Sequence, residues 1–122
     1  MAKIDLNSSS VSEIIAAYER GVKSNGLAII NRDGDAANAA YDFVWLCSKE
    51  LKKRGIDAQR KLLSLLENDG PQVRLCAAKD ALGFAPELGQ QELERISNLS
   101  LLWSIDAKLI LEEWKAGRLK FP

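Results

Sequence analysis

The side chains able to do chemistry in this chain are serines, two cysteines and scattered carboxylates, and no histidine accompanies them. The lack of histidine removes His-based triads, His metal ligands and the usual proton shuttle near neutral pH. Ser8, Ser9 and Ser10 have no Ser-x-x-Lys partner, and helix capping accounts for them better than nucleophilic attack does. We therefore predict that the protein is not an enzyme and uses no cofactor.

Two pairs of carboxylates are candidates for acid–base or metal chemistry. Asp33 and Asp35 flank a glycine, where aspartate favours turn geometry, and this stretch offers too few oxygen ligands for Ca²⁺. Glu112 and Glu113 lie in a late helical segment and fit a solvated face better than general acid–base catalysis. No metal site is predicted.

The two cysteines, Cys47 and Cys76, fall in predicted helices and lack the Cys-x-x-Cys spacing typical of metal sites. Free cysteine is often a small core residue, so buried reduced thiols are the favoured interpretation. A redox pair is the alternative.

The strongest local charge bias lies in residues 49–61. This segment contains two acidic residues, Glu50 and Asp57, and six basic residues: Lys49, Lys52, Lys53, Arg54, Arg60 and Lys61. Such a patch can bind phosphate or nucleic acid. The alternative is that these cations complement a helix C-terminus and aid solubility. The chain has no basic excess overall, so nucleic acid is the less favoured partner.

Trp45 is the most informative single residue. In the helix predicted for residues 36–54, it falls on a polar stripe opposite the core stripe. The polar stripe comprises Asn38, Asp42, Trp45, Lys49 and Lys52. An exposed tryptophan beside charges is typical of a protein-binding hot spot. The alternatives are that residues 1–9, the C-terminal tail or a second copy of the chain cover this face.

Length and composition predict one domain, 1–122. The chain has 122 residues, of which 47% are hydrophobic, enough for a sizeable core. Lys+Arg and Asp+Glu both number 17, so the net charge is zero. No run of about 18 apolar residues indicates a membrane span, and the N-terminal residues lack the apolar block of a signal peptide. We expect a cytoplasmic protein.

Helical periodicity recurs along the chain and period-two alternation does not, so the sequence predicts an all-α fold without strands. Six helices are expected, over residues 11–31 with a kink or stop at 24–26, 36–54, 57–68, 71–85, from 86 to near 98, and from there to 116. The predicted core faces are Ala36, Ala40, Phe43, Val44, Cys47 and Leu51 in the second helix, Leu88, Leu93 and Ile96 in the fifth, and Leu102, Ile105, Leu109 and Ile110 in the sixth.

Start and stop signals support these boundaries. Ser10 and Glu13 fit a capping box before the first helix. Asp35, at the end of a turn over residues 33–35, is the expected N-cap of the second helix. Gly55 and Gly117 are expected to end the second and last helices.

Residues 61–82 organise the chain as a pair of helices joined by a short loop. Leu62, Leu63, Leu65 and Leu66 form two adjacent apolar stripes, and residues 67–70 interrupt the pattern. Pro71 suits the first position of the next helix. The inner face of that helix is rich in alanine, which lets two helix axes approach closely: Val73, Ala77, Ala78, Ala81 and Leu82.

The pattern Leu-Leu-x-Leu-Leu, an acidic turn and Pro-x-Val-Arg-x-x-Ala-Ala-x-x-Ala-Leu resembles a HEAT repeat of the armadillo-like superfamily. The resemblance implies a short right-handed α-solenoid of about three helical hairpins, 11–54, 57–85 and 86–116. In that family the turn acid and the second-helix arginine link neighbouring repeats, and Asn68, Asp69 and Arg74 match these positions. Arg74 is therefore expected to pair with an acid of its own or the preceding hairpin, with Asp69 as the candidate.

The whole chain also resembles a small, uncharacterised bacterial family of single-domain HEAT-like proteins, a likeness that implies a fold and no activity. In HEAT-like arrays the second helices line the concave surface. The resemblance thus implies one binding face shared by Asp42, Trp45, Lys49, Gln72 and Lys79.

We expect a non-catalytic protein-interaction module with a protein partner, and a homodimer is open. The alternatives are an immunity or antitoxin-type protein that neutralises a bacterial toxin, and a nucleic-acid or phosphate binder that uses residues 49–61.

Overall fold

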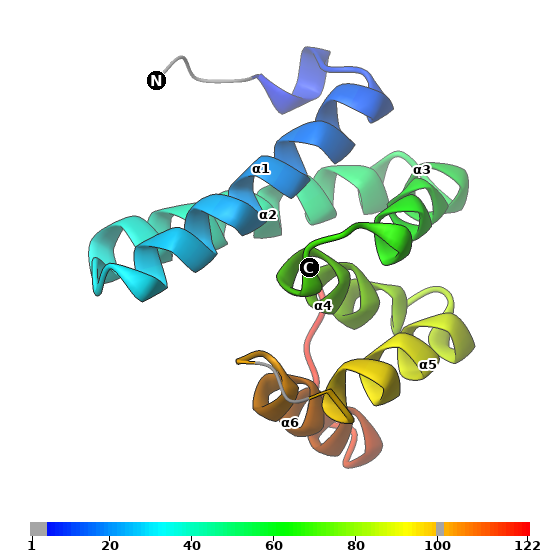
Figure 1. The fold of residues 1–122 in the computed structure, drawn as a ribbon. Coiled ribbons are helices and arrows are strands. Elements are labelled where there is room, and N and C mark those ends of the chain that lie inside the picture. The colour runs from blue at the N-terminus through cyan, green and yellow to red at the C-terminus, as the bar shows by residue number, and fades with distance from the viewer. Residues whose placement is uncertain (1–4, 100–101) are drawn as a thin grey trace. The chain divides into compact units, whose positions relative to one another are not determined.

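The computed structural model describes residues 5–99 and 102–122. Within these ranges the chain forms six α-helices, two 3-10 helices and no strand, so the all-α prediction is confirmed (Figure 1). The elements in chain order are η1 (Leu6–Ser8), α1 (Val11–Ile30), α2 (Gly34–Lys53), α3 (Ile56–Arg60), η2 (Lys61–Glu67), α4 (Pro71–Ala81), α5 (Pro86–Ser97) and α6 (Ser104–Lys115).

The helices group into two compact units. One runs up to Lys61 and includes Pro122, and the other spans Leu62–Phe121. The organisation as a single domain, 1–122, stays a prediction.

The first unit is built on the long helices α1 and α2, which pack against each other (Figure 1). Its buried side chains include Ile14, Tyr18, Cys47 and Leu51. The helices approach closely at Gly21, where a Cβ atom would lie 2.8 Å from Val44 Cγ2. Helix α1 is continuous through residues 24–26, so it does not stop there.

Local capping signals set the ends of these helices. Ser10 Oγ accepts the Glu13 N–H at 3.1 Å, and Glu13 Oε1 accepts the Ser10 N–H at 2.9 Å, which confirms the capping box. The predicted N-cap of α2 was wrong by two residues. Asp33 caps the helix by accepting the Ala36 N–H, and Asp35 lies in the first turn. The left-handed position between α1 and α2 falls on Arg32, with φ 58°.

The predicted core stripe of α2 is correct in phase but too long. Cys47 and Leu51 are buried and Phe43 is half-buried, whereas Ala36 at the start of the helix is exposed. Gly55, with φ 110°, follows the helix and ends it as expected.

Arg54 fastens η1 to the end of α2. Its guanidinium donates to the backbone carbonyls of Ser9 at 2.6 Å, Leu6 at 2.7 Å and Asn7 at 3.3 Å, and Nε donates to Glu50 Oε2 at 2.9 Å. A planar donor fork suits such a set of acceptors, and a lysine ammonium does not.

Arg54→Lys is therefore expected to loosen residues 5–9. We expect faster hydrogen exchange at the amides of Ser8 and Ser9 and a loss of about 1–2 kcal/mol in unfolding free energy, the cost of a few hydrogen bonds to a charged group. Hydrogen exchange with mass spectrometry measures the first effect and thermal denaturation the second. Lys53→Arg, at an exposed neighbour, is the control. Unchanged exchange at Ser8 and Ser9 would show that Arg54 does not hold this segment.

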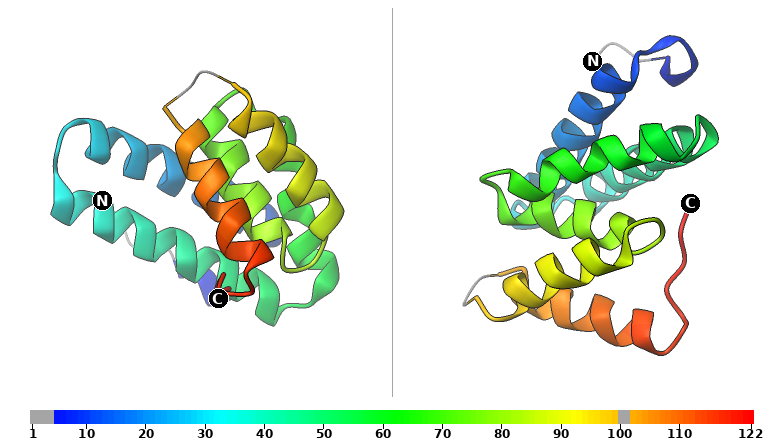
Figure 2. Two further views of the ribbon diagram at one scale, coloured as in Figure 1. Left: turned by 90° about the horizontal axis from the view of Figure 1, so that it is seen from below. Right: turned by 90° about the vertical axis from the view of Figure 1, so that its right-hand side faces the viewer.

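In the second unit, α4 packs on α5 and α5 packs on α6 (Figure 2). Their shared core comprises Leu75, Ala78, Leu82, Leu93, Ile96, Ala107 and Leu111. Pro71 and Pro86 each occupy the first turn of their helix, where a missing N–H costs nothing. Gly117, with φ 73°, follows α6 and ends it.

The first helix of the organising hairpin differs from the prediction. Residues 57–68 do not form one α-helix, because α3 ends at Arg60 and η2 continues as a 3-10 helix. A 3-10 helix has three residues per turn, so side chains three apart align. Leu62 and Leu65 are accordingly buried, which shows that the Leu-Leu-x-Leu-Leu spacing fits this geometry. Helix α4 also ends earlier than predicted, at Ala81.

The face of α4 that packs inward was predicted correctly. Val73, Ala77, Ala78 and Ala81 are all buried. The helix that approaches this alanine-rich face within its unit is α5, through Gly89, where a Cβ atom would lie 2.6 Å from the Ala78 carbonyl oxygen.

Arg74 is a scaffold residue, but its predicted acidic partner was wrong. Arg74 Nε lies 3.3 Å from Glu92 Oε2 on the following helix α5, and a terminal nitrogen donates to the Asn68 carbonyl at 2.7 Å. Asp69 is exposed. The same Glu92 also binds Arg95, at 2.8 Å.

The predicted inward face of α6 was wrong for three of its four residues. Leu102, Ile105 and Leu109 are exposed, Ile110 is half-buried against the core, and Ala107 and Leu111 are buried. Apolar residues occur on two faces of this segment, and the smaller side chains of Ser104 and Ala107 allow the closer approach to α5. Ser104 Oγ donates to the Ile96 carbonyl at 2.8 Å and also to that of Leu99. In α5, Leu88 is exposed rather than buried.

Candidate functional site

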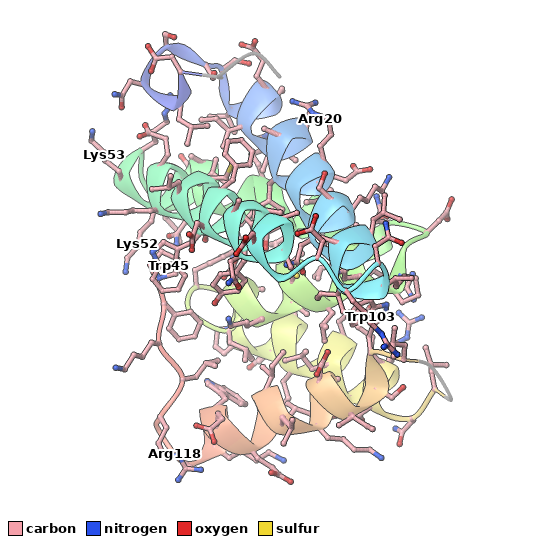
Figure 3. All side chains as sticks on the ribbon, turned by 90° about the vertical axis from the view of Figure 1, so that its left-hand side faces the viewer. Arg20, Trp45, Lys52, Lys53, Trp103 and Arg118 are labelled. Carbon is pink, nitrogen blue, oxygen red and sulfur yellow. The ribbon has the colours of Figure 1, made fainter. Side chains whose placement is uncertain are left out.

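The exposed face of α2 carries three of the five predicted binding residues. Asp42 and Lys49 are exposed and Trp45 is half-buried. Cys47 and Leu51, on the opposite side of the helix, are buried. Trp45, Lys52 and Lys53 are labelled along α2 in Figure 3. Helical geometry brings Asp42, Trp45 and Lys49 together because residues three, four and seven positions apart share one side of a helix.

The other two predicted residues, Gln72 and Lys79, lie on α4 in the second unit. Both are half-buried and both take part in interactions with other groups. The single face that the resemblance implies for all five residues stays a prediction.

Two exposed apolar side chains on α2 belong to the site and were missed by the sequence analysis. Leu46 is 51% exposed and Tyr41 is 50% exposed. Leu46 lies between Asp42 and Lys49 on the same side of the helix. The signal that identifies it is heptad spacing, since Asp35, Ala39, Asp42, Leu46, Lys49 and Lys53 follow one another at alternating intervals of four and three residues and all are exposed. We call these six residues the α2 stripe.

The charges of the α2 stripe are divided between its ends. Its acids, Asp35 and Asp42, lie in the N-terminal half of the helix, and its lysines, Lys49 and Lys53, lie in the C-terminal half. Leu46 separates them, with Trp45 beside it. This order gives the surface an apolar middle and ends of opposite sign.

The basic segment 49–61 is only partly available to a ligand. Arg54 is occupied by Glu50 and by backbone carbonyls, and Lys52 Nζ donates to the Pro122 carbonyl at 3.0 Å. Lys49, Lys53, Arg60 and Lys61 are exposed. The contact at Lys52 places Pro122 beside α2, seven residues beyond Trp45. Of residues 1–9, the structure describes 5–9, and Arg54 holds this segment near the end of α2.

Neither thiol has the properties of a reactive cysteine. Neither cysteine forms a disulfide, and Cys47 is buried whereas Cys76 is half-buried. Burial raises the pKa of Cys47 to about 11 and that of Cys76 to about 12, so both are protonated at neutral pH. In the part of the chain that the structure describes, no cluster of three metal-binding side chains occurs. No helix among residues 5–99 and 102–122 is long and apolar enough to cross a membrane.

A second exposed apolar face lies on and just before α6. Leu102, Ile105 and Leu109 are spaced for one side of the helix, and Ile105 is 67% exposed. This face stands apart from the predicted binding residues in the sequence.

Comparison with known proteins agrees with the helical fold. The structure matches the crystal structure of the protein RPA1889 from Rhodopseudomonas palustris CGA009 with a TM-score of 0.90 and 28% sequence identity, over 98% of this chain and 100% of that one. No curated protein matches the chain. A family model described as a domain of unknown function, DUF2019, matches residues 18–114. This range includes α2, α4 and α5 and most of the chain, and the protein therefore belongs to the DUF2019 family.

Proposed function

We propose that this protein is a non-catalytic protein-interaction module and that the exposed face of α2 is its binding surface. The observation that carries the proposal is the position of Trp45, half-exposed beside Leu46, Asp42 and Lys49 on the side of α2 away from its buried residues. Aromatic side chains in a partly apolar patch edged by charges are typical of binding hot spots.

The composition of the chain supports a binding role over a catalytic one. Histidine is absent from the sequence. The two thiols are protonated at neutral pH, which leaves them poor nucleophiles. Within the proposal the module is cytoplasmic and bacterial, its helices follow a right-handed HEAT-like solenoid, and Gln72 and Lys79 on α4 are further binding residues.

An immunity or antitoxin-type role is a special form of this proposal, in which the partner is a toxin of the same bacterium. Binding of nucleic acid or phosphate by residues 49–61 is less favoured. Arg54 and Lys52 already have partners there. The chain as a whole also has no excess of basic residues that would attract an anionic polymer.

Trp45→Ala is expected to leave the fold nearly intact and to abolish partner binding. A fully buried tryptophan costs about 3–5 kcal/mol when truncated, and half-buried Trp45 is expected to cost well below this. The measurement is affinity capture from a cell lysate with immobilised wild-type and variant protein, after thermal melting has shown that both are folded.

Leu109→Ala, which removes an exposed apolar side chain from α6, is the matched control. Proteins captured by the wild type and by Leu109→Ala, but not by Trp45→Ala, support the proposed surface. Equal capture by all three proteins would exclude it. A large loss of stability in Trp45→Ala would place this side chain in the core and remove the site.

A further inference from the structure

The α2 stripe has the charge pattern of a surface that binds a copy of itself, and we infer that two molecules of this protein associate through antiparallel α2 helices. The inference rests on the proposed function, because it names the partner of the same face. Its basis is the order of side chains along the stripe: acids in one half, Leu46 in the middle and lysines in the other half.

Antiparallel pairing about a two-fold axis between Trp45 and Leu46 matches opposite charges. With a rise of about 1.5 Å per residue, Asp42 and Lys49 each lie about 5 Å from this axis, on opposite sides of it. The two-fold therefore places Asp42 of each molecule opposite Lys49 of the other. Asp35 and Lys53 approach each other near the helix ends, offset by less than one helical turn, a distance that a long lysine side chain spans.

The same two-fold brings the apolar residues of both copies together. Leu46 meets Leu46 of the second molecule, and each Trp45 lies beside this contact. An interface with an apolar centre and a polar rim is the usual anatomy of protein association surfaces. Parallel pairing in register would instead place Asp42 against Asp42 and Lys49 against Lys49, which is repulsive. The pattern thus selects one orientation, and self-complementarity is the property that a two-fold interface requires.

The helix dipole does not account for the two central charges. Acids stabilise a helix in its first turn and cations in its last turn, and the effect falls off beyond them. Asp42 is the ninth and Lys49 the sixteenth residue of the 20-residue helix α2, so both lie outside the terminal turns. Neither is needed to fill the core, because both are exposed. A role between molecules gives a reason for their positions.

Sedimentation velocity of the full chain over a range of concentrations is the first test. A single helix face per molecule is at the small end of interface sizes, so we expect a Kd between about 1 μM and 1 mM. We expect dimerisation to weaken when the salt concentration rises from about 0.05 to 0.5 M, because the charged pairs are exposed and screened. A protein that stays monomeric throughout this range would overturn the inference. The proposed function would survive that result if Trp45-dependent capture of another protein persists.

Charge reversal tests the orientation. Asp42→Lys and Lys49→Asp should each weaken dimerisation by roughly tenfold or more, because each turns two attractive pairs into two repulsive ones. An equimolar mixture of the two variants should form a heterodimer of wild-type affinity. In that heterodimer the lysine introduced by Asp42→Lys lies opposite the aspartate introduced by Lys49→Asp. The unchanged Lys49 of the first variant lies opposite the unchanged Asp42 of the second. Lys108→Asp, an exposed change on α6, should dimerise like the wild type.

Two outcomes would overturn the antiparallel α2 pairing in a protein that does dimerise. One is a dimer that tolerates both single reversals, which would place the interface on another surface. If Lys108→Asp disrupts that dimer, the apolar face of α6 is the first candidate for the interface. The other is a mixture of the two variants that fails to recover association, which would exclude the pairing of positions 42 and 49. Circular dichroism of each variant shows that a lost dimer is not a lost fold.

Discussion

Arg74→Ala is expected to lower the free energy of unfolding by about 3 kcal/mol, or the melting temperature by roughly 10 °C. The reason is the partner that it leaves behind. Glu92 is buried in the second unit, and its Oε2 atom faces Arg74 Nε at 3.3 Å. Removing one member of a buried ion pair leaves the other charge in a poorly solvated place. The Asn68 carbonyl also loses the donor that Arg74 supplies at 2.7 Å.

The control is the second arginine bound to the same carboxylate. Arg95 lies 2.8 Å from Glu92 Oε1, but its side chain is 71% exposed. Exposed pairs contribute about 0–1 kcal/mol, so Arg95→Ala should change stability little. Chemical denaturation of both variants, compared with the wild type, measures the difference. Equal losses in the two variants would show that burial of Glu92 is not what makes Arg74 important.

The double variant Arg74→Met with Glu92→Leu separates a lost charge partner from lost packing. Replacing both members of a buried pair with apolar residues of similar size is often nearly neutral. We expect most of the stability to return, apart from about 1 kcal/mol for the hydrogen bond to Asn68. Partner capture by folded Arg74→Ala should match that of the wild type, because Arg74 is a scaffold residue. Lost capture with an unchanged melting curve would assign Arg74 to a binding site instead.

Gly89→Ala is the second change with a large expected effect. A Cβ atom at Gly89 would lie 2.6 Å from the Ala78 carbonyl oxygen and 3.0 Å from the Leu82 nitrogen. Both are backbone atoms of the α4 end and its C-cap, so no side-chain rotation relieves the clash. Helices α4 and α5 must separate, and overpacking of this kind costs about 1–3 kcal/mol even after alanine's higher helix propensity is included. Thermal denaturation should show this loss.

Gly34→Ala is the matched control for Gly89→Ala. Gly34 begins α2, and a Cβ atom there would have nothing within 4 Å. The substitution should be neutral or slightly stabilising, since it removes backbone freedom from the unfolded chain without strain. If Gly89→Ala is as well tolerated as Gly34→Ala, the close contact between α4 and α5 does not limit stability.

Several features of the fold could be predicted because their causes lie within one helical turn. Ser10 and Glu13 cap α1 through groups three residues apart, and Gly55 and Gly117 take the positive φ that ends a helix. The buried face of α4 followed from alanine spacing alone. The exposure of Asp42 and Lys49 followed in the same way from their helical phase relative to Cys47 and Leu51.

The pairing of residues distant in sequence was decided by tertiary structure. Arg74 was recognised as a scaffold residue, but its acid is Glu92, eighteen positions further on, because α5 rather than the preceding turn packs beside it. The 3-10 form of η2 likewise could not be predicted from the sequence, since the spacing of Leu62 and Leu65 fits either helix type. It depends on which leucines the rest of the fold covers.

The two exposed apolar surfaces show where periodicity stops being informative. In and before α6 large apolar residues occur on two sides, and helical periodicity assigned Leu102, Ile105, Leu109 and Ile110 to the core. The structure buries Ala107 instead, because a small residue lets the helix approach α5. On α2, the sequence analysis did not single out Leu46. Its exposure, and hence the α2 stripe, depends on which side of α2 the neighbouring helices cover. The sequence thus determined where helices form and which local groups cap them, whereas packing between helices decided which of several apolar faces each one buries.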